Sequence, residues 1–105
     1  MGMKFIDNEV FTGTHAWQAL DIAEIEGATV RLHWTDKPYT WHTNDGEEVF
    51  VVLSGAIDMH YRIDEKIYIK HMLAGQICHA AVGDEHVAHP VGEARILVVE
   101  KKDSI

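Results

Sequence analysis

Residues 42–55 read HTNDGEEVFVVLSG, a polar turn followed by an apolar run of strand length that ends at Gly55. His42 opens this stretch, Glu48 opens the apolar run, and a further histidine, His86, lies well downstream. Two imidazoles and one carboxylate are a common ligand set for a divalent transition metal. These three residues are therefore the first candidates for a metal site.

The composition is that of one globular domain. The chain has 105 residues, of which 47% are hydrophobic, and this is enough to build a single core. One cysteine, Cys78, excludes an internal disulfide, and neither an export signal nor an apolar run of membrane-spanning length is recognisable. The net charge of -8 comes without a basic stripe, which argues against a nucleic-acid partner. We expect a single domain over 1–105, located in the cytoplasm and without a membrane partner.

Short apolar segments separated by turn residues recur from residue 28 onward, at the spacing of about 8 to 12 residues that is typical of an antiparallel sandwich or barrel. The fold class expected is all-β. Segment 14–26 fits either a helix that ends before Gly27 or an edge strand, and its all-β surroundings favour the strand. The other expected strands lie near 28–34, 38–43, 48–54, 56–63, 67–73, 76–81, 86–89 and 94–100.

The loop between His42 and Glu48 decides whether these two side chains share a face. Asn44 projects from the same face of a strand as His42, because the two are separated by one residue. A two-residue loop would pair Asn44 with Glu47 and turn Glu48 away. A three-residue loop pairs Asn44 with Glu48 and keeps Phe50 on the same face. We predict the three-residue loop, because the alternative buries the Glu47 carboxylate without a partner.

A second register decision concerns the hairpin within residues 56–73. A two-residue loop would pair Met59 with Lys70 and place a lysine on an apolar face. A three-residue loop instead pairs Met59 with His71 and gives one coherent inner face. We predict the three-residue loop, which directs His71 inward. The residues expected to line a pocket are then Phe50, Met59, Tyr61 and His71.

With these motifs in place, the chain resembles the small single-domain cupins, which are double-sheet jelly rolls of antiparallel strands. The resemblance covers residues 28–100 and leaves 1–27 as a strand-like N-terminal extension. The first cupin motif, HxH(x)3-4E(x)6G, reads His42, Asn44, Glu48 and Gly55 in this chain. The second, G(x)5PxG(x)2H(x)3N, reads Gly75, Ala81, Gly83, His86 and Pro90 with its spacing intact.

The resemblance implies that His42, Glu48 and His86 point into the barrel and bind a divalent ion of Fe, Mn, Ni or Zn. Asn44 stands where the family usually has its second histidine, so it is expected to be a weak ligand or to hydrogen-bond a water or ligand beside the metal. Such a centre would act on a small polar organic molecule, by dioxygenase-type oxidation or by isomerisation. His71 is the candidate acid or base near it.

The change at Asn44 also supports a second hypothesis, in which the site has lost its metal and the protein is a metal-free ligand-binding or sensor cupin. In either case family habit implies a homodimer, since small cupins commonly pair through edge strands and an unpaired edge otherwise invites association.

Overall fold

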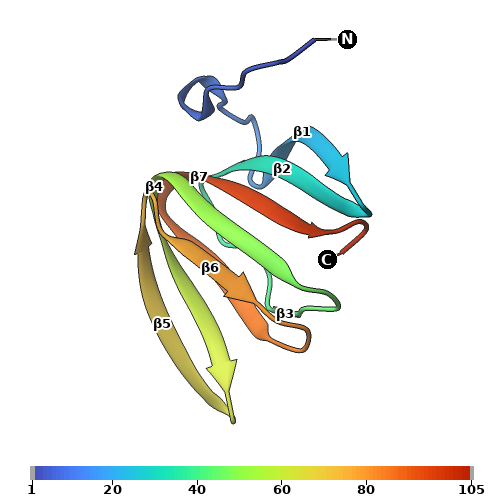
Figure 1. The fold of residues 1–105 in the computed structure, drawn as a ribbon. Coiled ribbons are helices and arrows are strands. Elements are labelled where there is room, and N and C mark those ends of the chain that lie inside the picture. Colours follow the sequence, from blue (N-terminus) through green and yellow to red (C-terminus); the bar gives the residue numbers. More distant parts are fainter. Residues whose placement is uncertain (1, 105) are drawn as a thin grey trace.

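The computed structural model describes residues 2–104, and most of them belong to strands (Figure 1). One short 3-10 helix, η1, lies near the N-terminus. No helix within residues 2–104 is long and apolar enough to cross a membrane. The elements are η1 (Asn8–Val10), β1 (Gln18–Ile25), β2 (Ala28–Thr35), β3 (His42–Thr43), β4 (Glu48–Ile63), β5 (Lys66–Leu73), β6 (Ile77–Ala80) and β7 (Glu85–Lys101).

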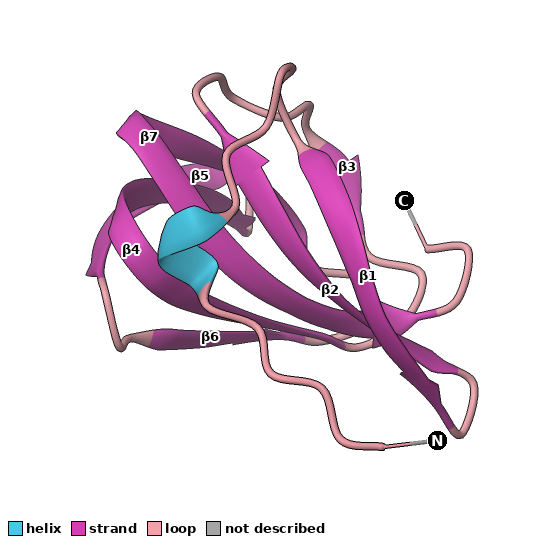
Figure 2. Ribbon diagram, turned by 90° about the horizontal axis from the view of Figure 1, so that it is seen from above, coloured by secondary structure: helices cyan, strands magenta, loops and turns pink. Residues whose placement is uncertain are grey.

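The strands pair antiparallel in the order β1-β2-β7-β4-β5, with β3 attached to β7 and β6 attached to β4 (Figure 2). This confirms the predicted all-β, antiparallel fold class. The two walls of the jelly roll are continuous through hydrogen bonds, because β4 and β7 are long enough to run through both of them. The early part of β4 pairs with β6, and its later part pairs with β5.

β4 and β7 form a long two-stranded ribbon that bends near its middle. The ribbon begins where Glu48 lies opposite Glu100, and its register becomes irregular around Ser54. Gly55 sits at this irregularity with φ of +75°, and a Cβ there would lie 2.3 Å from the carbonyl oxygen of Glu93. Only glycine allows the two backbones to approach so closely with this conformation.

Several expected strand boundaries are wrong because of this bend. Segments 48–54 and 56–63 form the single strand β4, and segments 86–89 and 94–100 form the single strand β7. Irregularities of the bulge type let a strand change direction without ending. The turn-like residues between these segments therefore mark a bend, not a chain reversal. Segment 38–43 is a strand only over its last two residues.

Segment 14–26 contains the strand β1, which pairs with β2 from Gln18 opposite Trp34 to Ile25 opposite Ala28. The strand prediction is therefore confirmed. The hairpin is closed by Glu26–Gly27, whose φ values of +50° and +81° are both positive, as a two-residue type I′ turn requires. The helical alternative is wrong because the glycine serves this turn and not a helix end.

β4 and β5 are joined by the two-residue turn Asp64–Glu65, with φ of +49° and +70°. The predicted three-residue loop is wrong, because the two-residue turn matches the twist of the flanking strands. Lys70 consequently lies opposite Met59. His71 takes the outer face, where its side chain is 55% exposed and its Nδ1 lies 2.6 Å from Oδ1 of Asp58. The prediction that His71 lines the pocket or acts beside the metal is therefore also wrong.

β3 pairs with β7 and not with β4, so the predicted pairing of Asn44 with Glu48 is wrong as well. His42 lies opposite His86, and the backbone of Asn44 extends the same contact with the chain before β7. The predicted loop length therefore has no bearing on where Glu48 points. Glu48 reaches the same region from the start of β4, which pairs with β6 and with the end of β7.

The core lies between the two walls of the bent ribbon. Within the described part of the chain, its members come from β4 and β7, apart from Met72 of β5, and they tend to alternate along these strands, which is the pattern of strands with one face buried. Cys78 of β6 packs half-buried against it. The cluster consists of Phe50, Val52, Ile57, Met59, Met72, Ala88, Ala94, Ile96 and Val98.

Candidate metal centre

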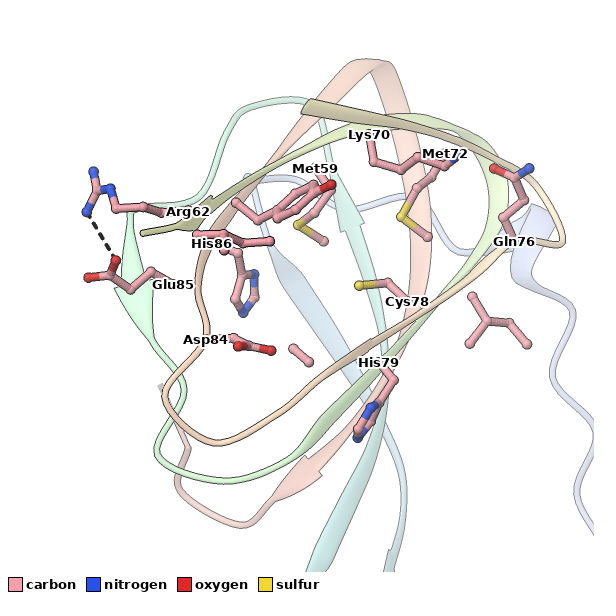
Figure 3. A pocket seen from close by; sticks show the side chains of 14 residues that line it. Met59, Arg62, Lys70, Met72, Gln76, Cys78, His79, Asp84, Glu85 and His86 are labelled. Atoms are coloured by element: carbon pink, nitrogen blue, oxygen red, sulfur yellow. Dashed lines mark hydrogen bonds and ion pairs between the residues drawn. The ribbon is translucent and has the colours of Figure 1, made fainter. Parts of the chain in front are cut away.

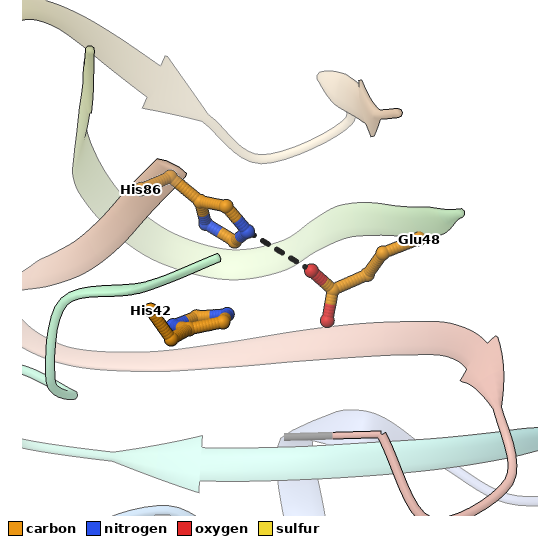
Figure 4. A group of neighbouring side chains, drawn as sticks. All are labelled: His42, Glu48 and His86. Carbon is orange, nitrogen blue, oxygen red and sulfur yellow. Dashed lines mark ion pairs between the residues drawn. The ribbon is translucent and has the colours of Figure 1, made fainter. Parts of the chain in front are cut away.

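The fold brings His42, Glu48 and His86 together at the end of the bent ribbon (Figure 4). Each offers one ligand atom, and the three atoms lie within 4.8 Å of one another. His86 and Glu48 are 3% and 5% exposed, and His42 is half-buried. His86 pairs with Tyr61 at the far end of β4, yet its Nε2 lies 3.2 Å from Oε1 of Glu48 at the near end. The bend of the ribbon therefore creates the cluster.

His42 is oriented as a metal-binding imidazole should be. Its Nδ1 donates a hydrogen bond of 3.0 Å to the carbonyl oxygen of Thr40, which leaves Nε2 without a proton when the ring is neutral. That Nε2 is buried and has no hydrogen-bond partner, and the same is true of Oε1 of Glu48. Two buried polar atoms without partners are costly, and a cation between them would satisfy both. The residues present therefore fit a metal ion.

Asn44 contacts the cluster through His86. Nε2 of His86 donates a hydrogen bond of 2.8 Å to Oδ1 of Asn44, whose side chain is buried. The amide nitrogen of Asn44 and Nδ1 of His86 are buried without partners. A metal ion bound at Nε2 would replace the hydrogen bond to Asn44, so this amide would have to turn to another group.

The protonation states of the cluster follow mainly from burial. Burial lowers the pKa of His42 and of His86 below the usual value for histidine, which keeps both rings neutral and able to bind a metal near neutral pH. Burial raises the pKa of Glu48 above the usual value for a carboxyl group. The burial that favours neutral histidines therefore also makes the Glu48 carboxylate costly to ionise unless a cation lies beside it.

Glu100 is a member of this site that the sequence analysis missed. It lies opposite Glu48 on β7, and burial together with a hydrogen bond to Glu48 raises its pKa to about 8. At neutral pH the Glu100 carboxyl thus holds a proton and shares it with Glu48. Ala94, Ile96 and Val98 precede Glu100 on the same face of β7. This alternation was the signal that Glu100 also points inward.

Two cavities adjoin the cluster. The larger has a volume of about 580 Å³, and its wall includes His86 together with two of the predicted pocket residues, Met59 and Tyr61 (Figure 3). The smaller, of about 240 Å³, is bordered by the three candidate ligands, by Glu100 and by the predicted pocket residue Phe50. His86 belongs to both walls, so a molecule in either cavity would lie beside the candidate metal ligands.

The sequence matches no protein-family model and no curated protein. The structure, in contrast, is similar to solved structures. A cupin-2 domain containing protein from Shewanella frigidimarina is 25% identical over 90% of this chain and 87% of that chain, with a TM-score of 0.76. A cupin superfamily protein from Desulfitobacterium hafniense is 11% identical over 91% of this chain and 87% of that chain, with a TM-score of 0.73.

A metal-containing structure also shares the fold. FeII HppE is 18% identical over 70% of this chain and 42% of that chain, with a TM-score of 0.61. The bent β4–β7 ribbon, the antiparallel order of the strands and these similarities agree with one another. This chain folds as a small cupin domain.

Proposed function

We propose that His42, Glu48 and His86 bind one divalent transition-metal ion and that this centre binds or transforms a small organic molecule. The observation that carries the proposal is the convergence of three ligand atoms within 4.8 Å, at a place where Nε2 of His42 and Oε1 of Glu48 are buried without a hydrogen-bond partner. Three protein ligands leave further coordination positions open to a small molecule.

The donor set suits several first-row ions. Imidazole and carboxylate ligands accept Fe, Mn, Ni and Zn, and availability decides among them. A bound ion would supply Lewis-acid chemistry and, if it is iron, the redox chemistry of a dioxygenase-type oxidation, which is the reaction we expect first. The solved FeII HppE structure is a precedent for iron on this fold.

The surrounding residues would prepare the site. Thr40 fixes the ring of His42 through Nδ1 and leaves its Nε2 free for the ion, whereas His86 would have to exchange its hydrogen bond to Asn44 for the ion. Phe50 stands edge-on to His86, with ring centroids 5.6 Å apart, and limits the access of water to that ring. Polar groups that are held in place before binding lose less entropy when the ion or ligand arrives.

Metal content tests the proposal directly. Untagged protein would be stripped with a chelator, reloaded separately with Fe(II), Mn(II), Ni(II) and Zn(II), and measured by elemental analysis and thermal melting. We expect one ion per chain and a stabilisation of about 4 kcal/mol when free metal is about a thousand times its Kd. His86→Ala should abolish both effects. His89→Ala is the matched control, since His89 lies on the same strand but is not part of the cluster. Failure of all four ions to bind stoichiometrically would refute the proposal.

A second candidate function is a metal-free ligand-binding or sensor domain. The hydrogen bond from His86 to Asn44 favours it, because it occupies a nitrogen that a metal would need. This function predicts that a chelator leaves both the melting temperature and the binding of a small molecule unchanged, whereas a metal protein would lose stability.

We also propose that the protein forms a homodimer. β5 lies at the end of the strand order and presents exposed apolar side chains, among them Ile67 and Ile69 at 54% and 61% exposure. An unpaired apolar edge favours pairing with a second copy. Light scattering that shows a monomer at micromolar concentration would overturn this proposal.

A further inference from the structure

Lys70 breaks the apolar pattern of the inner face of β5. It lies opposite Met59 and shares a face with Met72, and these two methionines are only 3% and 2% exposed. A lysine at such a position conflicts with the apolar pattern of a strand that faces a core. In natural proteins, conflicts of this kind concentrate at functional sites. Lys70 lines the larger cavity, the one that His86 also borders (Figure 3).

Lys70 and Arg62 are the lysine and the arginine of this cavity wall, and Arg62 is already paired. Arg62 pairs with Glu85 at 3.3 Å and also lies over the ring of Trp41. Asp84 accepts a hydrogen bond of 2.7 Å from a backbone amide. None of the ion pairs formed within residues 2–104 includes Lys70. The ammonium group of Lys70 is thus the cation available to an anionic ligand.

The rest of the cavity wall is largely apolar and rich in sulfur. Met59 and Met72 come from β4 and β5, and Cys78 comes from β6 across the cavity (Figure 3). Methionine side chains adapt to the shape of a bound group and make favourable contacts with aromatic rings. A volume of about 580 Å³ lies in the range of small-molecule sites. The cavity therefore suits a hydrocarbon group that carries one anionic end.

We propose that the larger cavity binds a small monocarboxylate with an arylalkyl body, its ring against Met59 and Met72 and its carboxylate at Lys70. One part of this proposal rests on the proposed function: the bound acid would be the molecule that reaches the metal centre, through the wall that both cavities share at His86. Binding of the acid itself does not require the metal.

Three probes separate the two parts of the site. Phenylpropionate carries both the ring and the charge, phenylpropionamide carries the ring alone, and acetate carries the charge alone. Their affinities would be measured by calorimetry in chelated protein, so that a carboxylate cannot bind to a metal ion. Cys78 is an internal reporter, since it is the single cysteine of the chain and lines the cavity. Occupancy should slow its alkylation.

We expect phenylpropionate to protect Cys78 and to bind about 1.5-fold to fivefold more tightly than its amide, the range set by an exposed ion pair. Acetate should not protect Cys78. Lys70→Gln should remove the preference for the acid and leave binding of the amide unchanged. Lys66→Gln is the matched control, because Lys66 lies on the same strand but does not line the cavity. Equal binding of acid and amide to the native protein, or an unchanged preference in Lys70→Gln, would overturn the proposal.

The two failures can be told apart. A protein that takes up no metal but shows the acid preference at Lys70 refutes the metal function and keeps the cavity assignment. A protein that binds metal stoichiometrically but leaves Cys78 unprotected by phenylpropionate refutes the cavity assignment alone.

Discussion

Substitution of Glu100 by glutamine should remove a pH dependence from the stability of the metal-free protein. Glu100 lies opposite Glu48, and burial raises its pKa from the usual 4.5 to about 8 in the folded state. Since the folded pKa is the higher one, the folded state holds a proton that the unfolded chain has already released. The stabilising contribution is complete below about pH 4.5 and is lost as the pH rises through about 8.

The magnitude follows from linkage. One proton held only by the folded state gives at most about 1.4 kcal/mol of unfolding free energy per pH unit. Glu100 is only half-buried, so solvent screening reduces this, and we expect a loss of about 0.5–1 kcal/mol between pH 7 and pH 8.5. Burial lowers the pKa of His33, His42, His86 and His89, so these four rings titrate below this window, and the raised pKa of the Cys78 thiol lies above it.

Urea unfolding in the presence of a chelator measures the effect. The native protein should lose stability as the pH rises across this window, and Glu100→Gln should be nearly flat. Glu93→Gln, an exposed glutamate of the same strand, should behave like the native protein. The reasoning is refuted if the native protein shows no loss, or if the loss persists in Glu100→Gln. Because Glu48 and Glu100 share the proton, Glu48→Gln should also flatten the dependence.

Three further variants test the fold and the corrected registers. Gly55→Ala should lower the free energy of unfolding by about 2 kcal/mol or more, because a Cβ would lie 2.3 Å from a backbone oxygen at a positive φ. Urea unfolding measures this loss. Metal binding should weaken as well, since the bend at Gly55 forms the site. The double substitution Asp64→Asn and Glu65→Gly should raise the unfolding free energy by about 0.5 kcal/mol, because both positions have positive φ and the turn relaxes. His71→Gln should leave metal content and phenylpropionate binding unchanged, because the His71 side chain lies on the outer face. A loss of either would mean that His71 points into the barrel after all.

Side-chain alternation within one strand could be predicted from the sequence. The expectation that Glu48 and Phe50 share an inward face is confirmed, since both are 5% exposed. That prediction used only the two-residue period of a strand, which is a local property. The predicted partner of β3 was wrong, because β3 pairs with β7, which is a tertiary contact between residues far apart in the sequence. The correct face was therefore predicted from an incorrect pairing.

The prediction of the loop length at residues 64–65 was wrong for a different reason. The three-residue loop was predicted because a two-residue loop would place a lysine on the inner face, and the twist of the turn was not considered. At the edge of the sheet the penalty for such a lysine is small, because Lys70 remains exposed while its neighbour Met72 is buried. A long cationic side chain can cover apolar surface and still keep its ammonium group in water. The lysine was thus no evidence against the two-residue register.

Glu100 shows how the bent ribbon builds a site from residues that appear unrelated in the sequence. Each end of the ribbon carries an inward polar residue of β7, Glu100 at one end and His86 at the other. On a straight ribbon the two would lie far apart, because extended strands rise about 3.3 Å per residue. The bend at Gly55 folds one end over the other, so that Glu48 contacts both of them. The conformation of one glycine therefore couples the stability of the barrel to the geometry of the candidate metal centre.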